Sequence, residues 1–188
     1  MAVPAPGPLY GLAKAPLGVI LEEISLREEK TMEIPANIKK MLEDPKNVKT
    51  LTTVNTDGNP YSVPVNSVSV MADGNIAFME LLDTCQTQRN MLNCLWFKKT
   101  VSILVVGDWG KGEVFQIKGT PYKLLTQGPI WDQYLGMIWK IIPQADPAGV
   151  WLITPEEVRD QNYFVRRKGE EERRANWTRW MTWKGVRG

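Results

Sequence analysis

Residues 44–70 read DPKNVKTLTTVNTDGNPYSVPVNSVSV, and this stretch decides the predicted fold. Val48–Val54 is rich in Val, Thr and Leu, which favours a β-strand, and Asn55–Asn59 has the composition of a turn. Pro60–Met71 alternates like a second strand, but its apolar residues change from odd to even positions around Asn66–Ser67. Such a slip usually marks a β-bulge, which either re-aims side chains toward a site or serves only the curvature of a barrel.

The rest of the chain continues the β pattern. The turn Ala72–Asn75 leads to a short strand, Ile76–Leu81, and repeats the Asp-Gly-Asn sequence of the first turn, as expected of an antiparallel meander. Further strands are predicted at Val101–Val106, at Glu113–Leu125 with an interruption at 119–121, and at Val150–Thr154. Together with the helices described next, these strands predict a small barrel of mostly antiparallel strands.

Helices are predicted between the strands. One begins at Pro35 and stops at Asp44–Pro45, and a second is capped by Asp83–Thr84. Gln127–Pro129 opens a third helix, and Pro155–Glu157 has the composition of a fourth helix start.

The composition excludes several kinds of chemistry. The 188 residues are 43% hydrophobic and carry a net charge of +2, which indicates a folded globular chain. There is no His, which removes Ser-His-Asp catalysis and His-ligated zinc, iron or haem, and the two Cys are too few for a Cys₄ site. No signal peptide or membrane span is predicted, so we expect reduced cysteines and a cytoplasmic location. The eight Trp are an excess that needs an explanation.

Composition divides the chain into three regions. Residues 1–31 form an extension rich in Pro and Gly and then in charges, residues 32–162 form the patterned domain, and residues 163–188 form a basic, Trp-bearing tail. The tail carries Trp177, Trp180 and Trp183 at every third position among basic residues, a pattern that can bind single-stranded nucleic acid. We favour the alternative that the tail packs its Trp side chains on the protein's own dimer or covers the opening of a cofactor site.

The patterned domain resembles the FMN-binding split β-barrel superfamily that includes pyridoxamine 5′-phosphate oxidase, close to its small FMN-binding and flavoredoxin-like members. Four pieces in the same order carry the resemblance: residues 44–70, NIAFMELLDT at 75–84, CQTQRNM at 85–91, and VFQIKGTPYKL at 114–124 ahead of a helix and a Val-rich strand. The resemblance implies a mainly β fold of the α+β class, a split β-barrel of about six antiparallel strands with Greek-key-like topology and peripheral helices.

Polar side chains gather at the predicted helix start near residue 85. A helix start offers free N–H groups and a favourable dipole to a phosphate, and ordinary capping with a solvated polar face needs the same residue types. The resemblance implies that the phosphate of FMN binds here. Superfamily members commonly have a basic residue where this chain has Gln86, so the countercharge must come from Arg89, Lys98, Lys99 or another region. The candidate phosphate ligands are Thr84, Gln86, Thr87, Arg89 and Asn90.

The resemblance also implies which residues line the isoalloxazine ring of the flavin. Glu80 is among them, although a charged residue at a strand edge need have no such role. Trp109, Trp131 and Trp139 are candidates to stack near the ring, and each also suits the core or a dimer interface. The residues assigned to the ring are Val63, Pro64, Val65, Asn66, Ser67, Phe78, Met79, Glu80 and Trp131.

These features predict an FMN-binding redox protein, either an oxidoreductase or an electron carrier. It would move electrons or hydride between a reduced donor, such as a nicotinamide or another flavin or iron–sulfur protein, and a small acceptor. Superfamily members are typically homodimers with the flavin at the interface, and no catalytic residue or metal ligand is assigned here. Two alternatives stay open: a deazaflavin (F420) cofactor in place of FMN, and a nucleic-acid-binding module that uses the tail.

Overall fold

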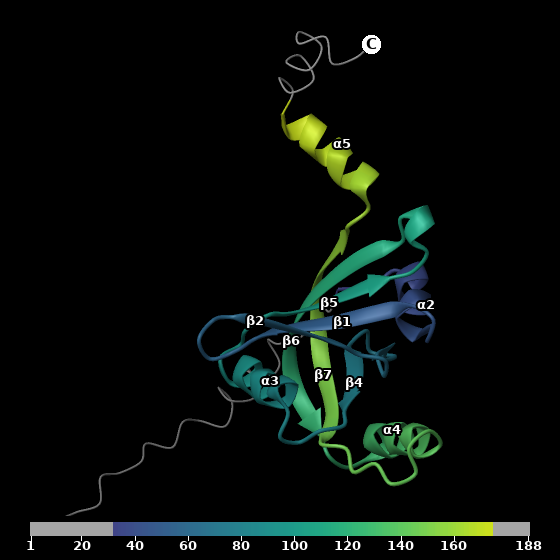
Figure 1. Cartoon of the computed structure of the whole chain (residues 1–188), viewed down its shortest axis with the longest axis vertical. Coiled ribbons are helices and arrows are strands. Elements are labelled where there is room, and N and C mark those ends of the chain that lie inside the picture. Colours follow the sequence, from purple (N-terminus) through teal and green to yellow (C-terminus); the bar gives the residue numbers. More distant parts are fainter. Residues whose placement is uncertain (1–31, 175–188) are drawn as a thin grey trace, which may run out of the picture. The chain divides into compact units, whose positions relative to one another are not determined.

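The computed structural model describes residues 32–174, and the tail residues Trp177, Trp180 and Trp183 lie outside this range. Seven antiparallel strands form one sheet with the order β2-β1-β5-β6-β7-β4-β3 (Figure 1). The predicted α+β class and split-barrel architecture are confirmed, with one strand more than the approximate number expected. The strands are β1 (Val48–Val54), β2 (Pro60–Pro64), β3 (Ser69–Val70), β4 (Ile76–Glu80), β5 (Val101–Val106), β6 (Val114–Leu125) and β7 (Gly149–Asp160).

The predicted strand 60–71 is in fact two strands at opposite edges of this sheet order. β2 pairs with β1, whereas β3 pairs with β4. The alternation therefore slips because the chain changes partners, and the expected bulge is replaced by a crossing at residues 65–68. Val68 is buried in the main core, and Val63, Val65 and Val70 pack against the same core. The change from odd to even apolar positions thus lets side chains before and after the crossing pack into the same core.

Within residues 32–174, four α-helices and one 3₁₀ turn accompany the sheet. The three helices expected at 35–44, after 83 and after 127 are confirmed, and their bounds are α2 (Ala36–Glu43), α3 (Gln86–Trp96) and α4 (Pro129–Trp139). A further helix, α5 (Tyr163–Arg173), follows β7, and the 3₁₀ turn η1 (Trp109–Lys111) precedes β6. None of the helices in residues 32–174 is long and apolar enough to cross a membrane.

The helix predicted to start at Pro155–Glu157 is wrong. β7 continues through these residues because Pro155 lies opposite Gly119 at a register shift. Proline is tolerated at such an irregularity, where the regular hydrogen-bond ladder is interrupted. β6 therefore continues through the interruption predicted at 119–121, where the register of its pairing with β7 shifts.

Side-chain hydrogen bonds anchor α3 to the sheet beneath it. The indole Nε1 of Trp151, which is fully buried on β7, donates to Gln88 Oε1 at 2.8 Å. The amide Nδ2 of Asn90 donates to Thr53 Oγ1 on β1 at 2.9 Å. All four residues are buried. Because a buried polar group without a partner costs about 1–3 kcal/mol, these two bonds fix how α3 sits on the sheet.

We predict that Gly119→Ala destabilises the protein. A Cβ at this position would lie 2.4 Å from the Thr154 carbonyl oxygen, which belongs to the backbone of the paired strand. Overpacking of this kind costs about 1–3 kcal/mol of unfolding free energy. Urea denaturation measures the effect.

Gly136→Ala is the matched control, because Gly136 lies inside α4 and a Cβ there meets nothing within 4 Å. It is expected to leave stability unchanged or to raise it by about 0.5–1 kcal/mol through helix propensity. Equal urea midpoints for Gly119→Ala and the wild type would contradict the close approach of β6 and β7.

Candidate functional site

The start of α3 is capped by Cys85. Its Sγ accepts a hydrogen bond from the Gln88 backbone N–H at 3.3 Å, so the predicted cap at Asp83–Thr84 is wrong. The cap satisfies one of the N–H groups that the first helical turn leaves without an intrahelical acceptor. The first turn carries no acidic residue. This helix start therefore keeps the positive end of its dipole available to an anion.

A chain of hydrogen bonds runs from the surface of α3 inward to β1. Arg89 Nη2 donates to Gln86 Oε1 at 3.1 Å, and Gln86 Nε2 donates to Asn90 Oδ1 at 2.7 Å. Asn90 in turn donates to Thr53, whose hydroxyl donates to the Tyr61 carbonyl oxygen at 3.4 Å. The exposed guanidinium of Arg89 is thus connected through one amide after another to the edge of the sheet.

The candidate phosphate ligands differ in how accessible they are. Thr84 and Arg89 are exposed, Gln86 is half-buried, and the side chains of Thr87 and Asn90 are buried. Arg89 is therefore the accessible cation of this turn. The side chains of Thr87 and Asn90 do not face solvent, and that of Asn90 ties the helix to Thr53 on β1.

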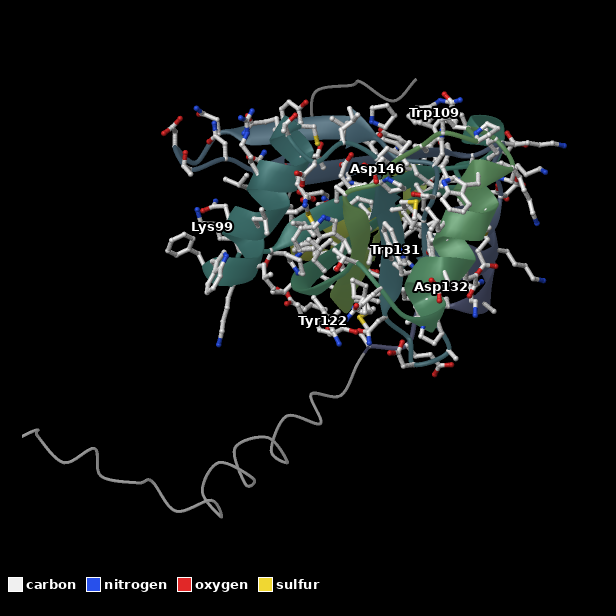
Figure 2. The ribbon with its side chains drawn as sticks, turned by 90° about the horizontal axis from the view of Figure 1, so that it is seen from below. Lys99, Trp109, Tyr122, Trp131, Asp132 and Asp146 are labelled. Atoms are coloured by element: carbon white, nitrogen blue, oxygen red, sulfur yellow. The ribbon has the colours of Figure 1, made fainter. Side chains whose placement is uncertain are left out.

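Lys98 and Lys99 cannot supply the phosphate countercharge at this turn. Both follow the last residue of α3, and the helix is about 16 Å long at 1.5 Å per residue. Lys99 Nζ instead lies 5.7 Å from the centre of the Phe97 ring. Figure 2 shows Lys99 far from Trp131. Of the three cations considered from the sequence, Arg89 alone is close to the helix start.

The crossing from β2 to β3 is held against the end of β4 by Ser67. Its Oγ donates to the Met79 carbonyl oxygen at 3.1 Å and accepts from the Met79 N–H at 3.0 Å. The neighbouring Asn66 is exposed, and Val65 N donates to Lys49 O at 2.9 Å. Ser67 is therefore a structural clamp, while Asn66 presents its amide to solvent beside it.

The remaining residues assigned to the ring lie in three different environments. Phe78 is buried in the main core, so its side chain is unavailable to a ligand. Met79 is buried in a second apolar cluster, and Trp131 packs against that cluster half-buried.

Glu80 Oε1 accepts a hydrogen bond from the Leu82 N–H at 3.1 Å. Pro64 is exposed and Val63 and Val65 are half-buried.

The two other candidate tryptophans lie elsewhere. Trp109 is 76% exposed on η1, and Trp139 donates from its indole to the Ala145 carbonyl oxygen at 3.0 Å. Trp109 and Trp131 lie apart in Figure 2. The structure therefore brings Trp131, but not Trp109, to the cluster that contains Met79.

Sequence reasoning missed two polar residues on the inner face of β1. Lys49 and Thr53 are buried beside Leu51, at positions 49, 51 and 53 of one strand face. Lys49 Nζ donates to the Asp44 carbonyl oxygen at 2.8 Å, and burial lowers the pKa of this ammonium although nearby Asp44 opposes the shift. The alternation of side chains along a β-strand could have indicated their burial, because it places both residues on the same face as Leu51.

No group of three or more His, Cys, Asp or Glu side chains that could hold a metal ion occurs within residues 32–174. The donors near α3 are amides, hydroxyls and one guanidinium, which suit an anion.

No protein-family model matches the sequence, and no curated protein matches it. Solved structures do match. An FMN-binding protein from Syntrophomonas wolfei is 10% identical, with a TM-score of 0.54, and the match covers 76% of this chain and 94% of that one. An F420 reductase is 19% identical, with a TM-score of 0.54, and the match covers 68% of this chain and 100% of that one.

A Listeria innocua protein provisionally named a pyridoxamine 5′-phosphate oxidase is 21% identical, with a TM-score of 0.52 over 67% of this chain and 96% of that one. At these identities the likeness concerns the fold. Together with the strand order and the α-helices described above, it shows that the chain has a split β-barrel fold like that of these three proteins.

Proposed function

We propose that the protein binds FMN, with the flavin phosphate at the start of α3, and acts in electron or hydride transfer. The observation that carries this proposal is the hydrogen-bonded chain from Arg89 through Gln86 and Asn90 to Thr53. It holds an accessible cation at a helix start in a fold shared with an FMN-binding protein. A phosphate there would receive backbone N–H groups, the helix dipole and a guanidinium.

We place the flavin ring on the crossing from β2 to β3. Asn66 has a free amide next to the Ser67 clamp, and Val63 and Val65 are only half-covered. An amide and backbone groups can bond the polar edge of the ring while valines cover its face. Glu80 and Trp131 lie toward the end of β4 and on α4, and they are proposed as further neighbours of the ring.

A bound flavin would supply the redox chemistry, accepting and releasing electrons or hydride at its own ring system. The protein's share would be to bind the phosphate, orient the ring and exclude water from one face. The absence of His from the chain is compatible with this role, since no imidazole is required for it. It also excludes a haem ligated by His from this chain.

A deazaflavin is the second candidate cofactor. The F420 reductase shares the fold, and Gln86 stands where FMN-binding members commonly have a basic residue. Parallel titration with FMN and with F420 separates the two, because the preferred cofactor binds more tightly. The nucleic-acid alternative rests on tail residues outside the described range.

We further propose that the protein works as a cytoplasmic homodimer that meets a small-molecule or protein redox partner. β2 is an edge strand whose residues are exposed or half-buried, and Tyr61 on it is 38% exposed. A second copy covering β2 would remove the unpaired outer edge of this strand from solvent and enclose the proposed ring site.

We predict that Arg89→Gln weakens FMN binding by roughly tenfold to a hundredfold, the loss expected for a charge-assisted hydrogen bond of about 1.5–3 kcal/mol. Quenching of flavin fluorescence during titration gives the dissociation constant. Lys98→Gln removes the same charge at the other end of α3 and is expected to leave that constant unchanged. If the two variants bind FMN equally well, the phosphate does not lie at the start of α3.

We also predict that Thr53→Val weakens FMN binding, because it removes the acceptor that orients Asn90. The free energy of unfolding should fall by about 1–3 kcal/mol as the buried amide loses its partner. Thr52→Val is the control, since Thr52 bonds Ser62 on the exposed side of the same strand. Loss of stability with unchanged affinity for FMN would show that the hydrogen-bonded chain has no part in binding.

A further inference from the structure

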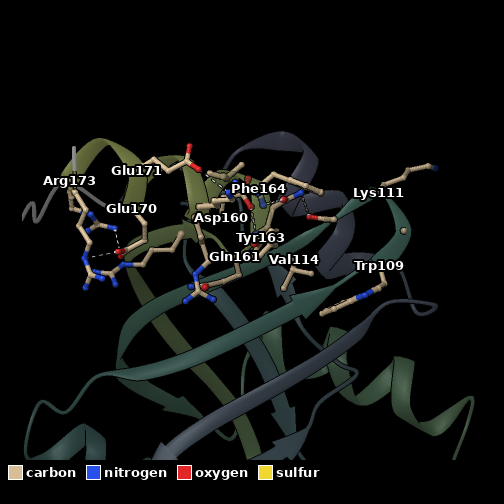
Figure 3. A pocket seen from close by; sticks show the side chains of 18 residues that line it. Trp109, Lys111, Val114, Asp160, Gln161, Tyr163, Phe164, Glu170, Glu171 and Arg173 are labelled. Carbon is tan, nitrogen blue, oxygen red and sulfur yellow. Dashed lines mark hydrogen bonds and ion pairs between the residues drawn. The ribbon is translucent and has the colours of Figure 1, made fainter. Parts of the chain in front are cut away.

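A hollow lies beside α5, apart from the residues assigned to the flavin. η1 and the start of β6 form one wall, and the end of β7 with α5 forms the other (Figure 3). The cavity between them has a volume of about 1450 Å³. Of the residues considered for the flavin, only Trp109 lines it, and Trp109 is not part of the proposed cofactor site.

The two walls of this hollow are locked together at Gly112 and Asn162. Asn162 Nδ2 donates to the Gly112 carbonyl oxygen at 3.2 Å, and Asn162 Oδ1 caps α5 by accepting from the Phe164 N–H at 2.8 Å. Gly112 has φ +71°, and a Cβ there would lie 2.0 Å from Asn162 Nδ2. Gln161 N donates to Val114 O at 2.8 Å beside this contact. The start of α5 is therefore fixed on the η1 loop.

Aromatic rings are unusually exposed around the hollow. Trp109, Tyr163 and Phe164 are 76%, 66% and 74% exposed, respectively, and all three line it. Tyr163 and Phe164 meet edge to face with their centres 5.5 Å apart. Figure 3 shows Trp109 on the η1 side and the two other rings at the start of α5. Exposed rings on facing walls suit a flat, heteroaromatic ligand.

The hollow is also positively charged. Its lining holds six Lys or Arg side chains against three Asp or Glu side chains. The ion pairs of Arg167 with Glu171 and of Arg173 with Glu170 are solvent-exposed, so a phosphate can compete for these cations. Arg166 forms no ion pair with any residue in 32–174. It is the cation most readily available to a ligand.

We propose that this hollow binds a nucleotide with at least two phosphates, with its base against Trp109, Tyr163 or Phe164 and its phosphates near Arg166. The aromatic rings can stack on the base and the cations can bind the phosphates, so the hollow offers contacts to both parts of the ligand. The cavity exceeds the roughly 300–1,000 Å³ of ordinary small-molecule pockets, which leaves room for base, sugar and phosphates. The site goes beyond the proposed function, since FMN is assigned to other residues.

The test is titration of the full-length protein with the fluorescent nucleotide etheno-ADP, followed by anisotropy. We expect saturable binding that weakens at least tenfold in both Trp109→Ala and Arg166→Glu. Lys168→Glu is the matched control, because it makes the same charge change on the same helix at a residue that does not line the hollow. It should bind like the wild type. Adenosine and inorganic pyrophosphate should each compete more weakly than ADP.

Four results would overturn the proposal. These are absence of saturable binding to the wild type, an equal loss in Lys168→Glu, tighter binding of a dT oligonucleotide than of ADP, and loss of FMN affinity in Trp109→Ala or Arg166→Glu. The third would indicate a nucleic-acid surface, and the fourth would make the hollow part of the flavin site. Failure of Arg89→Gln to affect FMN would leave this proposal standing, so the two accounts fail separately.

Discussion

The chain passes from one edge of the sheet to the other within residues 65–68, and Ser67 holds it there with two hydrogen bonds to the backbone of Met79. Because β2 and β3 pair with different neighbours, the apolar side must change at the crossing for Val63, Val65, Val68 and Val70 to reach one core. The crossing also leaves Asn66 exposed beside the clamp. One constraint thus sets the topology, the core and the position of the proposed ring site.

The orientation of α3 also depends on buried polar contacts. Trp151 with Gln88 and Thr53 with Asn90 tie this helix to β7 and β1 from inside the protein. Polar pairs of this kind fix orientation more than they add stability, because each bond mainly avoids the cost of an unpaired buried group. Here they fix the direction of the helix start and with it the position of Arg89. The proposed phosphate site at the surface therefore depends on hydrogen bonds in the interior.

Sequence patterns predicted the strands at 48–54 and 101–106 and the three helices that accompany the barrel, because period and turn chemistry are local. They failed where partners are distant in sequence: Pro155 lies within a strand only because Gly119 opposes it, and the change at 66–67 is a crossing. In the site, Arg89 and Asn90 were named from the helix start, but the role of Thr53 depends on a contact 37 residues away. Such contacts leave no local signal.

We propose above that this barrel carries a flavin. The most direct measurement is the absorption spectrum of the full-length protein purified after expression, together with the mass of any compound released on denaturation. We expect a yellow protein that releases FMN. A colourless protein that neither takes up FMN nor shows quenching of its Trp fluorescence when FMN is added would contradict it.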